Sequence, residues 1–95
     1  MLIGALNIEF RLHGITSLKS KRKISNSLKQ KIKNKFNLAV AEVGHHDSLD
    51  YLELGMVTLA NEKNRVEEVL NKALAMVEAI STDDIRNVRM EVFRL

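Results

Sequence analysis

The chain has 95 residues, a formal net charge of +3 and no cysteine, and 45% of its residues are hydrophobic. This length and composition predict one domain over residues 1–95, and the lack of cysteine excludes disulfides and thiolate metal sites. The apolar start is broken by Asn7 and Glu9, and no run approaches the roughly 20 apolar residues of a membrane span. We therefore expect a cytoplasmic protein with no signal peptide and no membrane partner.

Residues 2–12 alternate in polarity, which is typical of a strand with one buried face. The apolar positions are Leu2, Leu6, Ile8, Phe10 and Leu12. His13 and Gly14 then break the pattern. His13 has no identifiable nucleophile or carboxylate partner in the sequence, so we do not expect it to act as a catalytic base.

A helix is expected over about residues 18–35, with Ser17 as its N-cap. The apolar residues Ile24, Leu28, Ile32 and Phe36 recur every four positions and form one stripe. Lys21 and Lys35 point toward this stripe, so their side chains would have to extend past it to reach solvent.

The same helix carries the strongest functional signal in the chain. Nine of the 15 basic residues lie between Arg11 and Lys35, and no acidic residue lies between Glu9 and Glu42. Intrahelical ion pairs therefore cannot offset the repulsion between like charges. This pattern favours contact with phosphates, and a merely solvated face is the alternative. The expected nucleic-acid-binding residues are Lys19, Lys21, Arg22, Lys23, Lys29 and Lys33.

The rest of the chain predicts a hairpin, a helix and a last strand. Residues 38–43 and 51–60 are expected to be strands joined by the polar turn of residues 44–48. Apolar spacing predicts a helix over about residues 62–80 with Asn61 as its N-cap. After a break at residues 81–84, a final strand is expected from the alternation of Val88, Met90 and Val92. The order β-α-β-β-α-β predicts an α+β, ferredoxin-like sandwich, with a four-stranded antiparallel sheet and two helices on one face.

Three smaller features carry weaker signals. His45, His46 and Asp47 are adjacent, but a flexible turn rarely presents the fixed ligands that zinc requires, so we expect no metal and no cofactor. Glu42 interrupts an apolar strand, and we expect it to face solvent or to pair with a basic residue of the first helix. The outer sheet face is expected to be apolar, which favours a homodimer or larger homo-oligomer. Its expected residues are Ala5, Ala39, Ala41, Val57 and Leu59.

Two segments resemble a known family. Residues 17–22 read Ser-Leu-Lys-Ser-Lys-Arg and resemble the SLKxKR signature of the YlxP-like family of uncharacterised bacterial proteins, the DUF503 domain. Residues 37–43 resemble the NxxVAEV stretch of the same family, and the order and spacing hold over nearly the whole chain. The resemblance implies a ferredoxin-like fold and a role linked to RNA or the ribosome. The family hairpin usually carries a Trp, whereas residues 47–51 here read Asp-Ser-Leu-Asp-Tyr.

Together these observations predict a small non-enzymatic protein that contacts ribosomal or other RNA through the phosphate backbone. Base stacking is not expected, because the chain has only three Phe and one Tyr. The alternative is a homo-oligomeric protein-interaction module with no nucleic-acid role. An enzyme is the least supported class, because no Gly-rich phosphate loop or acid–base pair stands out.

Overall fold

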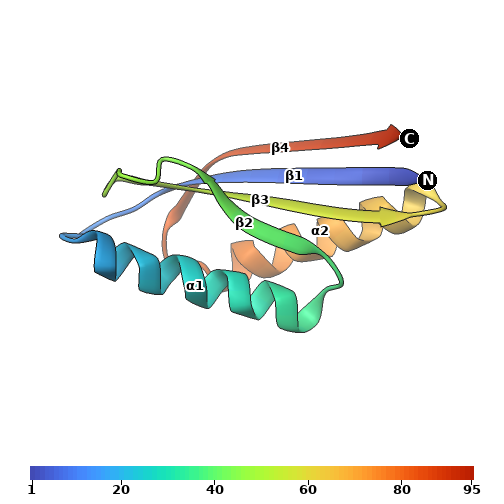
Figure 1. Cartoon of the computed structure of the whole chain (residues 1–95). Coiled ribbons are helices and arrows are strands. Elements are labelled where there is room, and N and C mark those ends of the chain that lie inside the picture. Colours follow the sequence, from blue (N-terminus) through green and yellow to red (C-terminus); the bar gives the residue numbers. More distant parts are fainter.

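The computed structural model describes residues 1–95 and consists of one four-stranded sheet covered by two helices. The strands β1 (Leu2–Arg11), β2 (Ala39–Gly44), β3 (Tyr51–Ala60) and β4 (Asp84–Arg94) pair antiparallel in the order β2-β3-β1-β4. The helices α1 (Leu18–Lys35) and α2 (Lys63–Ile80) lie on one face, and the other face is open (Figure 1). The predicted ferredoxin-like α+β sandwich is confirmed.

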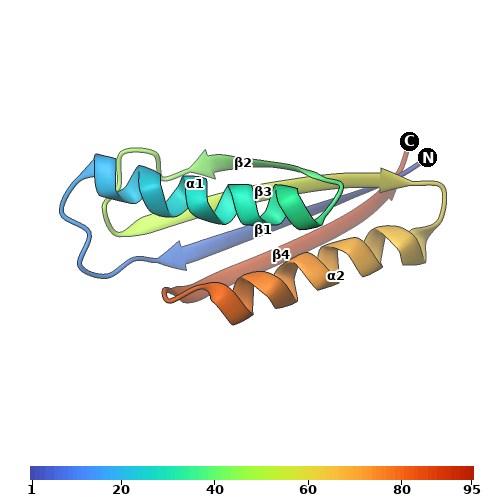
Figure 2. The same ribbon diagram turned by 90° about the horizontal axis from the view of Figure 1, so that it is seen from below.

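The hydrophobic core lies between the sheet and the helices. Alternate residues of β1, from Leu2 to Phe10, are buried on the helix side, as their period of two requires. α2 packs on β1, β3 and β4, whereas α1 packs on β2 at the edge of the sheet (Figure 2). A side-chain carbon at Gly4 would overlap Val66 and lie 2.8 Å from Leu70 Cδ1, so the absence of a side chain allows α2 to approach β1 closely.

The N-terminus of α1 confirms its predicted cap, whereas that of α2 contradicts it. Ser17 caps α1, because its Oγ accepts a hydrogen bond from the Ser20 amide at 3.1 Å. The predicted cap Asn61 is wrong, because the N-cap residue of α2 is Glu62, whose side chain makes no capping hydrogen bond. Asn61 lies one residue too early to reach the free amides of the first turn. Neither helix has the length of apolar sequence that crossing a bilayer requires.

Strand β4 begins at Asp84, four residues before the alternating stretch that predicted it. Its first residues are mostly exposed because β4 is an edge strand, so burial leaves little pattern in them. The first residues of β4 are a strand because their backbone pairs with β1. The register of this pairing shifts between Glu9 and Phe10 of β1.

Candidate nucleic-acid interface on the first helix

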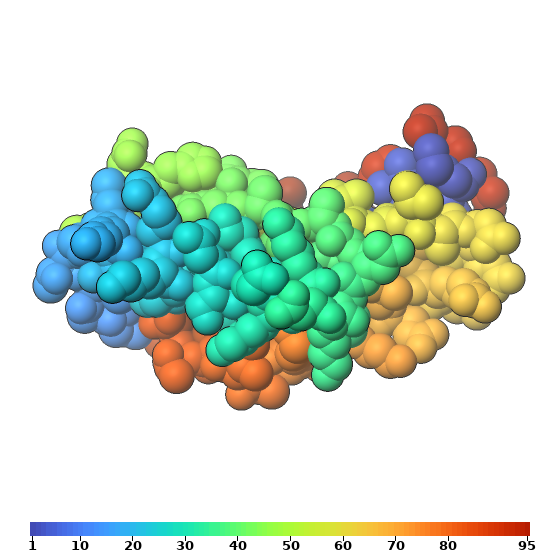
Figure 3. All heavy atoms as spheres, turned by 60° about the horizontal axis from the view of Figure 1, so that its bottom comes forward, coloured from blue at the N-terminus to red at the C-terminus, as the bar shows by residue number.

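The basic face of α1 consists of Lys19, Arg22, Lys23, Lys29 and Lys33. Four of these side chains are exposed, and that of Lys29 is half-buried. They lie within about 120° of one another around the helix axis, at 100° per residue. Figure 3 shows α1 running across this side of the molecule. The helix thus presents one continuous row of cations to solvent.

The basic face has no acidic counterpart within its own helix. The 18 residues of α1 include no carboxylate, and the first turn contains no acidic residue to interact with the helix dipole. Lys21 is the one basic residue of α1 with a carboxylate partner, Glu42 at 3.4 Å. The charges of the basic face are therefore balanced by solvent ions, which a polyanion can displace.

Lys21 was expected to bind nucleic acid, but its side chain is buried. Its side chain is 3% exposed, and its Nζ donates a hydrogen bond to the His45 carbonyl. Glu42 Oε1 lies 3.4 Å from the same Nζ, and Ser25 Oγ donates to Glu42 Oε2 at 3.3 Å. The ammonium group thus points toward the sheet and the β2–β3 turn, away from the exposed side of α1. The expected pairing of Glu42 with the first helix is confirmed.

This partly buried ion pair joins the two segments that resemble the family signature. Lys21 belongs to the first segment and Glu42 to the second, and together they fix the first turns of α1 on β2. A sequence signal existed, because Lys21 falls on the inward side of the predicted helix and Glu42 on the core-facing parity of its strand. The signature therefore includes structural residues as well as exposed cations such as Arg22.

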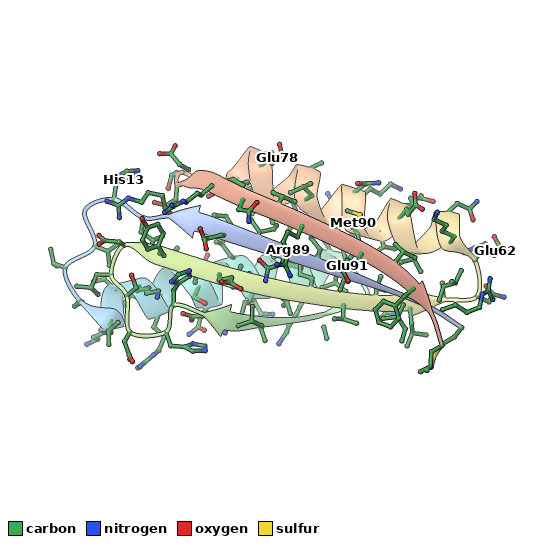
Figure 4. The ribbon with its side chains drawn as sticks, turned by 90° about the horizontal axis from the view of Figure 1, so that it is seen from above. His13, Glu62, Glu78, Arg89, Met90 and Glu91 are labelled. Atoms are coloured by element: carbon green, nitrogen blue, oxygen red, sulfur yellow. The ribbon has the colours of Figure 1, made fainter.

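His13 has the carboxylate partner that the sequence did not reveal. Its Nε2 lies 2.9 Å from Asp84 Oδ2, at the turn that follows β1 (Figure 4). Both side chains are largely exposed, at 60% and 78%. An exposed ion pair of this kind contributes little to stability.

The three residues of the β2–β3 turn are not brought together. The side chain of His46 lies 3.8 Å from Glu42, whereas His45 lies between Glu9 and Glu53 on the open sheet face. The sequence did not single out Glu9 and Glu53, although both fall on the outward parity of their strands. Their proximity depends on strand register, because Glu9 and Glu53 pair directly across β1 and β3.

The open sheet face is apolar at one end, as expected. Val57 and Leu59 are 46% and 62% exposed, and Ala39 and Ala41 are also exposed. A groove of about 310 Å³ is lined by Ala5, Ala39, Ala41 and Val57. Arg89 and Glu91 of β4 line the same groove, whereas Met90 points toward the core (Figure 4).

Sequence comparison places these features in a family. Residues 3–90 match the family described as "Protein of unknown function (DUF503)". The uncharacterized protein YlxP of Bacillus subtilis (strain 168) is 25% identical over 92 residues, which cover 97% of this chain and 100% of YlxP.

Two solved structures show similarity to the whole chain at low sequence identity. SnoaB, a cofactor-independent oxygenase from Streptomyces nogalater, has a TM-score of 0.49 and 9% identity, over 99% of this chain and 92% of its own. At3g17210 from Arabidopsis thaliana has a TM-score of 0.46 and 12% identity, over 98% of this chain and 94% of its own. The sequence match over residues 3–90 shows that the chain belongs to the DUF503 family of proteins of unknown function.

Proposed function

We propose that the protein is a non-enzymatic RNA-associated factor whose basic face binds the sugar–phosphate backbone. The supporting observation is that five cations of α1 lie on one side of the helix without an acidic partner. Keeping like charges so close is unfavourable for an isolated helix, and phosphates relieve this repulsion when bound. At 1.5 Å per residue, α1 is about 27 Å long, which is long enough to follow several successive phosphates.

Recognition in this proposal depends on backbone charge and shape. The open sheet face carries Tyr51 and Phe93, which the register places near opposite ends of the sheet, too far apart to form one stacking platform. The ring of Tyr51 is also covered by the guanidinium groups of Arg11 and Arg86, at 5.2 and 4.8 Å. Base stacking on the sheet is therefore not part of the proposal. Ribosomal RNA is the proposed partner, because the resemblance to the YlxP-like family implies a role linked to RNA or the ribosome.

The test is a salt titration of RNA binding with the untagged protein. With about five phosphates contacted, a fourfold rise in salt should weaken binding to single-stranded RNA by about 100-fold. The double variant Arg22→Glu/Lys29→Glu should bind much more weakly than the wild type. The matched control is Lys63→Glu/Arg65→Glu, which makes the same change in net charge on α2. Salt-independent binding, or an equal loss in the control, would contradict the proposal.

The cellular form of the test is crosslinking of the protein to RNA followed by sequencing of the bound fragments. A concentrated footprint on ribosomal RNA, lost in Arg22→Glu/Lys29→Glu and kept in Lys63→Glu/Arg65→Glu, is the expected result. Diffuse crosslinks that both variants retain would count against a ribosomal target.

A second candidate function is homo-oligomerisation through the open sheet face. It is supported by the exposed apolar side chains of Val57 and Leu59 on β3 and of Phe93 on β4, the two strands that flank β1. A second copy of the chain would cover them, and two copies would bring two basic faces to one RNA. Sedimentation at high concentration should show a dimer that Val57→Glu dissociates and that the exposed helix variant Ala79→Glu leaves intact. A wild-type monomer at high concentration would rule this candidate out.

A further inference from the structure

Two carboxylates face each other on the open side of the sheet. Glu9 of β1 and Glu53 of β3 are direct partners in the register, and their side chains are only 22% and 24% exposed. Like charges directly opposite each other on neighbouring strands destabilise a sheet. A cation between or beside the two groups would relieve this repulsion.

An imidazole nitrogen lies between these carboxylates. His45 Nε2 is 2.9 Å from Glu9 Oε2 and 3.6 Å from Glu53 Oε1. The three ligand atoms all lie within 4.8 Å of one another. In a tetrahedral zinc site with bonds of 2.0–2.2 Å, neighbouring ligand atoms are roughly 3.3 Å apart. The distances from His45 Nε2 to the two carboxylate oxygens, 2.9 and 3.6 Å, lie on either side of this value. Small side-chain movements would therefore accommodate an ion.

Each carboxylate is oriented by a second residue through its other oxygen. Asn7 Nδ2 donates to Glu53 Oε2 at 2.8 Å, and Arg86 Nε lies 3.6 Å from Glu9 Oε1. The oxygens that remain are those that face His45. Outer partners that fix the orientation of ligating side chains are a regular feature of metal sites.

The backbone and the neighbours of His45 hold its imidazole beside the two carboxylates. His45 adopts a positive φ of 56°, and its carbonyl accepts the hydrogen bond from the buried Lys21. Its ring lies against Tyr51, with ring centroids 5.2 Å apart. A side-chain carbon at Gly44 would lie 2.7 Å from Glu53 Oε1, so glycine leaves room for that carboxylate. The imidazole is thus held in place by contacts outside the cluster.

We propose that Glu9, His45 and Glu53 bind one divalent transition-metal ion such as Zn²⁺. Imidazole with carboxylates suits Zn²⁺ better than Mg²⁺, which prefers oxygen ligands alone. Three protein ligands leave a fourth position for water or another ligand. The site lies on the opposite side of the sheet from the basic face, so this proposal does not depend on RNA binding. The competing explanation is that Arg86 and the hydrogen bond from Asn7 already hold the two carboxylates, and that no metal binds.

The test uses the untagged full-length chain after treatment with a chelator, at slightly alkaline pH, because protons compete with metal ions for ligand atoms. Titration with Co²⁺, followed by its visible absorption, should show saturable binding of one ion per chain. Zn²⁺ should displace the Co²⁺, whereas Mg²⁺ should not. His45→Asn should weaken Co²⁺ and Zn²⁺ binding by at least tenfold, and His13→Asn and His46→Asn should leave it unchanged.

Thermal unfolding supplies a second readout that does not depend on the absorption of the ion. Zn²⁺ should raise the Tm of the wild type and of His46→Asn, but not that of Glu53→Gln, which nearly preserves the side-chain shape. Absence of saturable Co²⁺ binding would overturn the proposal in favour of carboxylates held by Arg86 and Asn7 alone. Equal loss of binding in His45→Asn and His46→Asn would also overturn it, because that result indicates loose binding by the turn.

Discussion

Helices α1 and α2 have 18 residues each and cover the same face of the sheet, yet they carry charge in opposite ways. α2 has three basic and three acidic residues, and its Lys72 pairs with Glu68 at 2.8 Å. α1 has eight basic residues and no acidic one, and only Lys21 has a carboxylate partner. Basic residues of α2 are therefore balanced by ion pairs within the helix, whereas α1 has no such pairs.

The two helices differ in what they bury as well. The buried residues of α2 are Val66, Leu70, Ala73 and Val77, whereas those of α1 are Lys21, Ser25, Leu28 and Ile32. α2 therefore supplies more apolar burial, and α1 docks partly through a polar network with Glu42. We therefore expect α2 to contribute more to stability than α1, whose exposed cations repel one another.

The largest effect is expected from the packing of α2. Leu70 is fully buried against Gly4, so Leu70→Ala should lower the free energy of unfolding by about 3–4 kcal/mol. Leu28→Ala in α1 should cost less, about 2 kcal/mol, because Leu28 is 7% exposed and lies near the edge strand. Urea unfolding of the two variants measures the difference. A greater loss in Leu28→Ala would invert the proposed roles of the helices.

The next effect concerns the polar contact of α1 with β2. Lys21→Met leaves Glu42 without its cation and should cost about 3 kcal/mol in urea unfolding. The double variant Lys21→Met/Glu42→Leu should recover much of this loss, because no unpaired charge then remains. RNA affinity of the folded Lys21→Met protein should stay close to that of the wild type, since Lys21 is buried. A large loss of affinity together with a weaker salt dependence would indicate that Lys21 contacts a phosphate, and would contradict this separation of roles.

Lys21 also illustrates which features the sequence could and could not reveal. The six elements were predictable because periods of two and 3.6 residues are local properties of the chain. The inward position of Lys21 followed from the helical period, but its acceptor, the His45 carbonyl, lies 24 residues away and depends on the fold. Parity placed Glu9 and Glu53 on the outer face, yet only the register of β1 with β3 makes them direct partners.

The charge difference between the helices can be tested by adding one carboxylate to each. Asn26→Glu places an acid three or four residues from Arg22, Lys23 and Lys29, and should stabilise the protein by about 0.5–1 kcal/mol at low salt. Asn71→Glu in α2 lies near Glu67 and Glu68, and should destabilise it by about 0.3 kcal/mol. Both effects should shrink at 1 M salt, where the Debye length is about 3 Å.

The same two variants also test the proposed function through their RNA affinity. Asn26→Glu should weaken RNA binding while it stabilises the fold, because the new carboxylate neutralises part of the basic face. Asn71→Glu should leave RNA binding unchanged. If Asn26→Glu stabilised the fold without affecting RNA affinity, the basic face would not be the contact surface.

The smallest effect concerns the ion pair of Lys72 with Glu68 on α2. The hydrogen bond from Lys72 and its positive charge hold the pKa of Glu68 below its ordinary value of 4.5. In Lys72→Gln, an NMR titration should show the pKa of Glu68 moving back up toward that value. A lowered carboxyl pKa stabilises the fold at neutral pH, and this contribution disappears as the pH falls through the pKa of Glu68. The small loss of stability in Lys72→Gln should therefore vanish in acid.

The matched change in α1 is Lys23→Gln, and its effect on the free energy of unfolding should have the opposite sign. It removes one of several mutually repelling cations, so it should stabilise the protein slightly at neutral pH. No carboxylate of α1 titrates beside it, so this gain should persist where the effect of Lys72→Gln has vanished. A loss of stability in Lys23→Gln that disappears in acid would instead show that Lys23 has an acidic partner in solution. In that case the basic face would be locally compensated after all, like the charges of α2.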